Sequence, residues 1–181
     1  MAMMFESGLS LFTMLILSTF LFLQVTVNAL KEIANQLRKK DWDFSLNPCD
    51  GNTNWTTPLG NHPPPQFNNV VNCNCSLDDV CHVVNISLKG QDLAGVLPPS
   101  LAKLPSIKMI DLSFNYLNGN IPEEWESTKL EFISVTGNRL SGSIPTFLGN
   151  ITTLKSLGLE NNIFSGKVPA ELGNLKSLSL L

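Results

Sequence analysis

The chain has 181 residues, of which 43% are hydrophobic and 15% are charged, and its formal net charge is −3. This length and composition suffice for one domain with a hydrophobic core. The nearly balanced charge gives no basic surface, so nucleic acid is excluded as an expected partner.

The N-terminus is typical of a secretory signal peptide. Residues 9–23 carry no charge, and Val27-Asn28-Ala29 fits a small-residue cleavage site after Ala29. We therefore expect residues 1–29 to be a signal peptide that sends the chain into the secretory pathway. The alternative is an uncleaved membrane anchor, because the leading segment contains Glu6 but no Lys or Arg, and residues 9–27 could just span a bilayer.

A short amphipathic helix is predicted for residues 30–40. Leu30, Ile33, Ala34 and Leu37 recur at helical spacing and would share one apolar face. The segment DWDFSLNPC follows, and its Trp and Phe are expected to pack beneath this helix in an N-terminal cap that extends over residues 30–82.

Four clustered cysteines, Cys49, Cys73, Cys75 and Cys81, predict two disulfides in an oxidising compartment. Residues 50–72 are rich in Asn, Thr, Pro and Gly and predict a loop, which a Cys49–Cys73 bond would close. Cys75–Cys81 would then close a smaller loop, but four cysteines allow three pairings and the sequence does not choose among them. Zinc held by Cys73, Cys75, Cys81 and His82 is disfavoured because zinc-ribbon spacing is absent, so neither a metal nor a cofactor is expected.

Four Asn-x-Ser/Thr sequons are consistent with an extracytoplasmic location, and their acceptors are Asn54, Asn74, Asn85 and Asn150. Asn74 lies between two cysteines and is the least favoured of the four. A glycan at Asn85 would shield one end of any binding surface nearby.

From Val80 onward the chain repeats itself every 23–24 residues. The repeats align on one polar position, with an apolar-x-apolar pair before it and a Leu or Phe, a Gly and a Pro after it; the polar position is Gln91, Asn115, Asn138 and Asn162. Such a period predicts a solenoid whose apolar pairs form a parallel sheet and whose coils share one core. The Asn amide is expected to bond to buried backbone groups at the turn.

This pattern, LxxLxxLxLxxNxLxGxIPxxL, resembles the plant-type leucine-rich repeat. The resemblance implies an α/β solenoid, a right-handed superhelix with a parallel sheet on its concave face and a disulfide-bonded N-terminal cap. Residues 83–181 would hold about four repeats and a truncated fifth. The predicted helix followed by DWDFSLNPC and VVNCNC is similar to the N-terminal cap of plant leucine-rich-repeat receptor-like kinases. The segments NWTTP, CNCS, VCHVV and LKGQDLAGVLPPSLAKLP resemble most of all the subgroup with a malectin-like domain.

That family implies a single-pass plasma-membrane receptor with an extracellular ligand-binding part and a Ser/Thr kinase inside the cell. The chain has no glycine-rich nucleotide loop, VAIK-like Lys, HRD or DFG motif, and we do not expect it to be an enzyme itself. Because it stops within a strand at Leu181, we expect a fragment whose membrane contact would come only through missing C-terminal parts. A secreted repeat protein that inhibits a cell-wall hydrolase is the alternative.

A partner of such a solenoid would contact side chains that point outward from the concave face. The expected partners are a peptide, carbohydrate or protein ligand and a co-receptor ectodomain. Exposed aromatic and Arg side chains are the usual anchors of interfaces. The candidate ligand-binding residues are Met109, Asp111, Phe114, Tyr116, Phe132, Arg139 and Glu160. The alternative is that these side chains only cover each other along the sheet.

Overall fold

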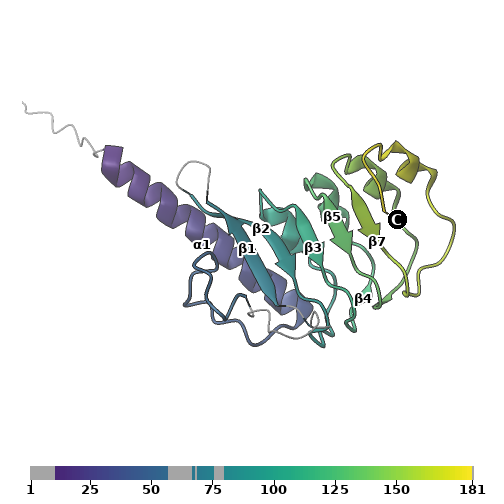
Figure 1. Cartoon of the computed structure of the whole chain (residues 1–181), viewed down its shortest axis with the longest axis horizontal. Helices are drawn as coiled ribbons and strands as arrows, with labels where there is room; N and C mark the ends of the chain where they lie inside the picture. The colour runs from purple at the N-terminus through teal and green to yellow at the C-terminus, as the bar shows by residue number, and fades with distance from the viewer. Residues whose placement is uncertain (1–10, 57–66, 68, 76–79, 181) are drawn as a thin grey trace, which may run out of the picture.

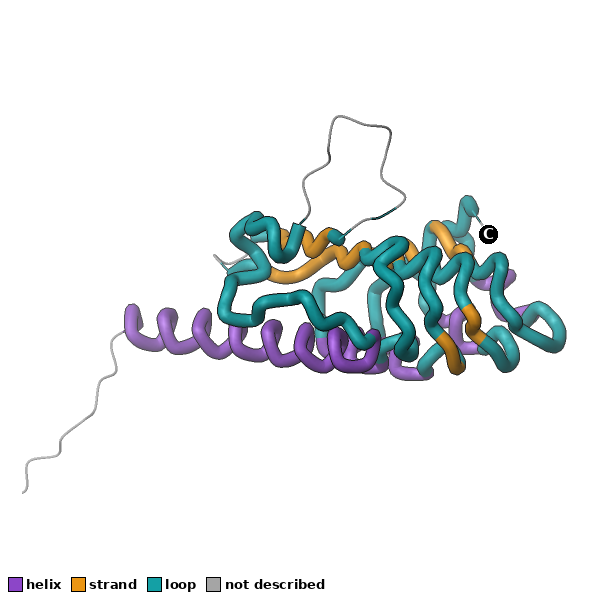
Figure 2. Tube along the Cα trace, turned by 90° about the horizontal axis from the view of Figure 1, so that it is seen from below, coloured by secondary structure: helices purple, strands orange, loops and turns teal. Residues whose placement is uncertain are grey.

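The computed structural model describes the backbone of residues 11–56, 67, 69–75 and 80–180, and the side chains from residue 24 onward within these ranges. One long helix and one strand precede a row of coils, and that strand pairs antiparallel with the strand of the first coil, so that all parts form one elongated body (Figure 1). The strands of the main sheet lie along one side of the coils and short 3₁₀ helices along the other (Figure 2). This arrangement confirms the predicted solenoid with a parallel sheet.

The main sheet has five strands. The first two pair antiparallel, and the second, third, fourth and fifth are parallel to one another. In spatial order they are β1 (Val70–Asn74), β2 (His82–Ser87), β3 (Met109–Asp111), β5 (Phe132–Ser134) and β7 (Ser156–Gly158).

The other side of each coil begins at the repeat proline. Each 3₁₀ helix starts directly after that proline. The ring of the proline fixes its φ, and its extended backbone leads the chain into the turn. These helices are η1 (Pro99–Lys103), η2 (Glu123–Ser127), η3 (Thr146–Asn150) and η4 (Ala170–Asn174). A second, two-stranded parallel sheet forms from β4 (Asn118–Gly119) and β6 (Arg139–Leu140).

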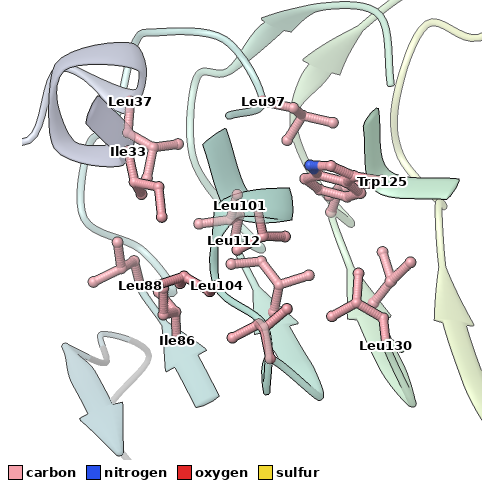
Figure 3. Close-up of a cluster of buried hydrophobic side chains, with 14 of the residues drawn as sticks. Ile33, Leu37, Ile86, Leu88, Leu97, Leu101, Leu104, Leu112, Trp125 and Leu130 are labelled. Carbon is pink, nitrogen blue, oxygen red and sulfur yellow. The ribbon is translucent and has the colours of Figure 1, made fainter. Parts of the chain in front are cut away.

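The core is built from equivalent apolar positions that stack from coil to coil. In the main sheet Ile86, Ile110, Ile133 and Leu157 stand in register, and each is 0–1% exposed. Figure 3 shows Ile33 of the helix at one end of this cluster and Leu130 toward the other. No coil could bury this surface alone, so stability depends on stacking.

A buried tryptophan in the second coil was not foreseen as a core residue. Trp125 is 0% exposed and occupies the position that Leu101 and Leu148 hold in the neighbouring coils. Its indole Nε1–H donates to the Pro98 carbonyl of the previous coil at 2.9 Å. The ring can therefore be buried without an unsatisfied donor.

The repeat asparagines join neighbouring coils, as predicted. The Asn138 amide Nδ2 donates to Val135 O at 2.9 Å in its own coil and to Leu112 O at 3.0 Å in the coil before. Its Oδ1 accepts from Leu117 N at 3.0 Å. Asn115 and Asn162 repeat this pattern, so each amide satisfies backbone groups that have no ladder partner.

Helix α1 (Leu11–Leu37) is continuous through the predicted cleavage site and covers the first coil. The predicted apolar face is confirmed, since Leu30, Ile33 and Leu37 are 0% exposed. Burial begins earlier than expected, because Thr26 is 8% and Ala29 is 2% exposed.

The end predicted for this helix, at residue 40, was wrong, because the chain leaves the helix at Arg38, which has φ +60°. The Lys39 amide donates to Ala34 O at 2.8 Å and the Arg38 amide to Asn35 O at 3.2 Å. This pair of bonds is a Schellman motif, in which a left-handed residue satisfies the last carbonyls of a helix.

The first coil is fitted to the end of α1. A Cβ on Gly95 would lie 1.9 Å from the Gln36 carbonyl oxygen, so only glycine fits at this approach. Where later coils have the repeat asparagine, the first coil has Gln91. Its Oε1 accepts from the Lys39 ammonium at 3.2 Å, and this buried ammonium also pairs with Asp41 at 2.8 Å.

The loop predicted for residues 50–72 was partly wrong, because strand β1 already begins at Val70 and pairs with β2 and Thr56. Residues 57–66 and 68 lie outside the described part. Two β-branched residues, Val70 and Val71, favour the strand. The predicted packing of Trp42 and Phe44 within the cap is confirmed, since Trp42 is buried and the ring centroids of Trp42 and Phe44 lie 4.9 Å and 5.6 Å from that of Trp55.

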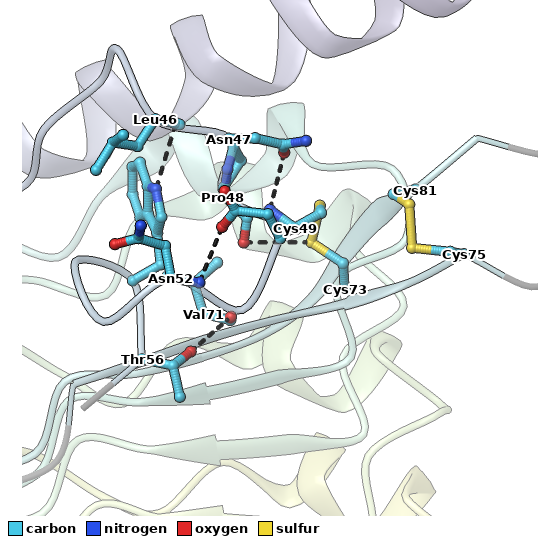
Figure 4. The surroundings of a disulfide bond; sticks show 12 residues. Leu46, Asn47, Pro48, Cys49, Asn52, Thr56, Val71, Cys73, Cys75 and Cys81 are labelled. Atoms are coloured by element: carbon cyan, nitrogen blue, oxygen red, sulfur yellow. Dashed lines mark hydrogen bonds between the residues drawn. A yellow bond between two sulfur atoms is a disulfide. The ribbon is translucent and has the colours of Figure 1, made fainter. Parts of the chain in front are cut away.

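The two expected disulfides are formed, and the pairing that the sequence left open is Cys49–Cys73 and Cys75–Cys81 (Figure 4). The first joins the segment after α1 to β1, and the second joins the ends of β1 and β2. Because all four sulfurs are in disulfides, the alternative zinc arrangement with His82 is contradicted.

Candidate functional site

The outward-pointing residues of the strands form two rows across the concave face. Asn85, Met109, Phe132 and Ser156 are register partners in the first row. The second row lies two residues further along each strand and consists of Ser87, Asp111, Ser134 and Gly158. Met109 and Phe132 are therefore neighbours, as expected for a patch, and both are half-buried.

Part of this face is satisfied by its own hydrogen bonds. The hydroxyls of Ser113 and Ser134 lie 2.6 Å apart, and the Thr136 hydroxyl donates to the Glu160 carboxylate at 2.6 Å. The bond from Thr136 holds the pKa of Glu160 below its usual value. For these side chains the structure favours the alternative interpretation, in which they cover each other along the sheet.

Two aromatic residues are more exposed than these hydrogen-bonded polar side chains. Phe114 is 55% and Tyr116 is 47% exposed, although both belong to the second coil, which lies between two other coils. The Lys89 ammonium lies 5.2 Å from the Phe114 ring centroid, and the Arg139 guanidinium carbon lies 4.9 Å from that of Tyr116. Three predicted candidates, Phe114, Tyr116 and Arg139, thus come together on neighbouring coils.

The backbone of Phe114 is strained. Its φ is +57°, a left-handed conformation that costs a bulky residue about 1–2 kcal/mol. The equivalent residues of the other coils are Gly90, Gly137 and Asn161, which are the types that tolerate positive φ. Since a smaller residue would serve the solenoid better, the exposed ring is a candidate for function.

A pocket of about 530 Å³ opens beside these rings. It is lined by Phe67, Lys89, Gly90, Asp92, Phe114 and Tyr116. This volume falls within the range of about 300–1,000 Å³ that is usual for small-ligand sites. Lys89 and Asp92 belong to the first coil, whereas Phe67 belongs to the irregular cap, where no periodicity could have located it.

The remaining candidates lie apart from this pocket. Asp111 stands between Ser87 and Ser134 on the strands and accepts the Ser113 amide at 2.9 Å. Glu160 is two coils away from Phe114. Of the residues predicted from the sequence, Phe114 and Tyr116 therefore line the pocket, whereas Asp111 and Glu160 belong to the hydrogen-bonded polar groups along the sheet.

The four sequon asparagines have different environments. Asn150 is exposed at the end of η3, where its amide donates to Glu126 at 2.7 Å. Asn54 is half-buried, and its side chain accepts from Asp43 N at 2.8 Å, whereas Asn74 is exposed on β1. The Oδ1 atom of Asn85 is buried without a hydrogen-bond partner among the described residues. Glycosylation at these positions stays a prediction.

Comparison with known proteins agrees with this architecture. Residues 106–127, 129–151 and 153–175 match the Leucine Rich Repeat family model. The fold is therefore a leucine-rich-repeat solenoid with a disulfide-bonded N-terminal cap. Among the residues whose side chains the structure describes, which begin at residue 24, no helix is long and apolar enough to cross a membrane.

The similar proteins include receptor-like kinases of Arabidopsis thaliana. Over 128 residues the chain is 44% identical to the probable LRR receptor-like serine/threonine-protein kinase At1g07650 of Arabidopsis thaliana. This alignment covers 69% of this chain and 12% of that protein. The LRR ectodomain of the receptor kinase SOBIR1 from Arabidopsis thaliana superposes with a TM-score of 0.67 at 25% identity, covering 87% of this chain and 77% of that one. The chain is a homologue of plant LRR receptor-like kinase ectodomains.

A further solved structure, the BIR3–SERK2 complex from Arabidopsis thaliana, gives a TM-score of 0.63 at 26% identity. The match covers 84% of this chain and 77% of the other.

Proposed function

We propose that this chain is the extracellular recognition segment of a plant membrane receptor-like serine/threonine kinase. Its partner binds the concave face around Phe114, Tyr116 and Arg139. The observation that carries the proposal is the exposed Phe114 ring on a strained backbone, next to Tyr116 and Arg139. Aromatic and Arg side chains contribute most of the binding energy at many protein interfaces.

A peptide or protein is the main class of partner for this surface as a whole. One of the similar solved structures is a complex of BIR3 with SERK2, which supports a protein partner, such as a co-receptor, for this chain. Any phosphorylation belongs to the parent receptor and not to this segment. The parent is further proposed to carry a malectin-like domain, on the residues of NWTTP, CNCS and VCHVV.

Secretion follows from the same proposal. The signal peptide and the two disulfides would place the repeats outside the cell, where disulfides persist. A mass shift after removal of N-linked glycans from the expressed chain would measure how many sequons are used.

Photo-crosslinking at one residue tests the binding surface. Tyr116 is replaced by a benzophenone amino acid, and the secreted chain is irradiated in plant cell culture. The matched control carries the same group at Glu124, which is exposed on η2 at the other side of the coil.

The proposal predicts an adduct from position 116 that excess unlabelled chain competes away and that the Arg139→Ala change weakens. No such adduct is expected from position 124. Equal labelling from both positions, or none from position 116, would contradict binding at this face.

A further inference from the structure

The pocket beside Phe114 arises because the first coil has small side chains where the second has rings. Repeat spacing aligns Gly90 with Phe114 and Asp92 with Tyr116. A ring therefore has no counterpart across from it in the first coil. Lys89, Gly90 and Asp92 line the resulting space together with both rings and with Phe67 of the cap.

The two rings are supported from the third coil. A Cβ on Gly137 would lie 2.9 Å from Cδ1 of Phe114, so this ring lies directly against that glycine. Arg139 covers Tyr116 at 4.9 Å. Because Gly137 and Arg139 are on the third-coil side and the pocket is on the first-coil side, the rings present their other side to the pocket.

The pocket combines these apolar surfaces with one cation and one carboxylate. Lys89 provides hydrogen-bond donors and no acceptor, whereas ionised Asp92 provides acceptors and no donor. Their charges balance, so neither a strongly acidic nor a strongly basic ligand is favoured. A neutral ligand with many hydroxyl groups and an apolar ring face matches both features.

We propose that this pocket binds a short neutral oligosaccharide, with a sugar ring against Phe114 and Tyr116 and hydroxyls on Lys89 and Asp92. The C–H face of a pyranose ring is apolar and stacks on aromatic side chains, while its hydroxyls both donate and accept. A volume of about 530 Å³ is in the range of pockets that hold compact small ligands. This ligand class rests on the proposed function, because the pocket lies at one end of the same surface.

The chain offers a specific probe, since Tyr116 is its single tyrosine. Incorporation of 3-fluorotyrosine gives one ¹⁹F resonance that reports on the pocket alone. The full secreted chain is titrated with cellotriose, laminaritriose, xylotriose and mannotriose, and separately with trigalacturonic acid.

We expect a saturable shift of this resonance with at least one neutral trisaccharide and at least a tenfold weaker response to the acidic one. Phe114→Gly should abolish the shift while leaving the melting temperature close to that of the wild type, because glycine relieves the positive-φ strain. Ile163→Ala is the control, since Ile163 is exposed at the row position of Tyr116 two coils away.

Absence of a shift with all four neutral sugars would overturn the proposal. So would retained binding in Phe114→Gly, or a preference for trigalacturonic acid. A polypeptide adduct at position 116 together with no response to sugars would leave the proposed function intact and remove only the carbohydrate ligand.

Discussion

The Phe114 ring of the second coil lies against Gly137 of the third, where a methyl group would approach the ring Cδ1 to 2.9 Å. Gly137 itself has φ +69°, so its lack of a side chain serves both its own backbone and the position of the ring. This contact holds the ring toward the pocket of the first coil.

A double-mutant cycle tests that contact. Gly137→Ala should destabilise the chain by about 1–2 kcal/mol from backbone strain, with a further penalty from displacing the ring. In the Phe114→Gly background the second penalty vanishes, so denaturant unfolding should show a coupling of at least about 0.5 kcal/mol. Additive effects would mean that the ring does not rest on Gly137.

Asn138→Ala should lower the free energy of unfolding by about 2–4 kcal/mol. The change leaves Leu112 O, Val135 O and Leu117 N without their side-chain partner inside the core. Asn118→Ala is the control, because Asn118 is exposed and its change should stay within about 0.5 kcal/mol. Similar midpoints of denaturant unfolding for the two variants would contradict the role of the amide.

The start of the folded cap can be located by truncation. A chain that begins at Gln24 should be more stable than one that begins at Leu30 by about 1–2 kcal/mol, because Thr26 and Ala29 are buried. The free energies of unfolding of the two chains measure this difference. Equal values would show that the residues before Leu30 add nothing to the cap.

Glu131 should make the fold sensitive to acid. Its carboxylate lies between Lys155 and Lys108, and hydrogen bonds first from Lys155 and then from Lys108 hold its pKa below the usual 4.5. A lowered pKa in the folded state stabilises the fold above about pH 4.5, and this contribution is lost as the pH falls through the folded value.

The measurement is the melting temperature of the wild type and of Glu131→Gln between neutral pH and pH values well below 4.5. The wild type should have the higher melting temperature at neutral pH, and the difference between the two melting temperatures should shrink in acid. Lys129→Gln serves as a charge control, since Lys129 is exposed. A constant difference at every pH would rule out this contribution.

The sequence predicted most of the scaffold because each coil repeats the same physical requirement. In each coil an Asn amide must hydrogen-bond the backbone groups of the turn, and an apolar pair must fill the core. The roles of Asn138 and Ile133 could therefore be assigned from their spacing alone. The end of α1 was missed because an Arg in place of the usual glycine adopts the left-handed conformation there. Strand β1 was missed because only Val70 and Val71 favour a strand at the end of a segment that is otherwise rich in Asn, Thr, Pro and Gly.

The candidate site was predicted only in part. Exposed aromatic residues at outward positions pointed to Phe114 and Tyr116, and the structure brings Arg139 to them. The pocket depends on which side chains are small in the neighbouring coil and on Phe67 from the cap. Spacing identifies a position in a coil, but the depth of a hollow depends on side chains from several coils at once.

Binding of the labelled secreted chain to intact plant cell surfaces tests the central claim most directly. The Tyr116→Ala/Arg139→Ala variant is compared with the wild type and with Glu123→Ala/Glu124→Ala, which changes the exposed 3₁₀ side of the same coil. We predict at least tenfold weaker saturable binding for the first variant at an unchanged melting temperature, and wild-type binding for the second. Equal affinity of all three chains would contradict recognition through the concave face.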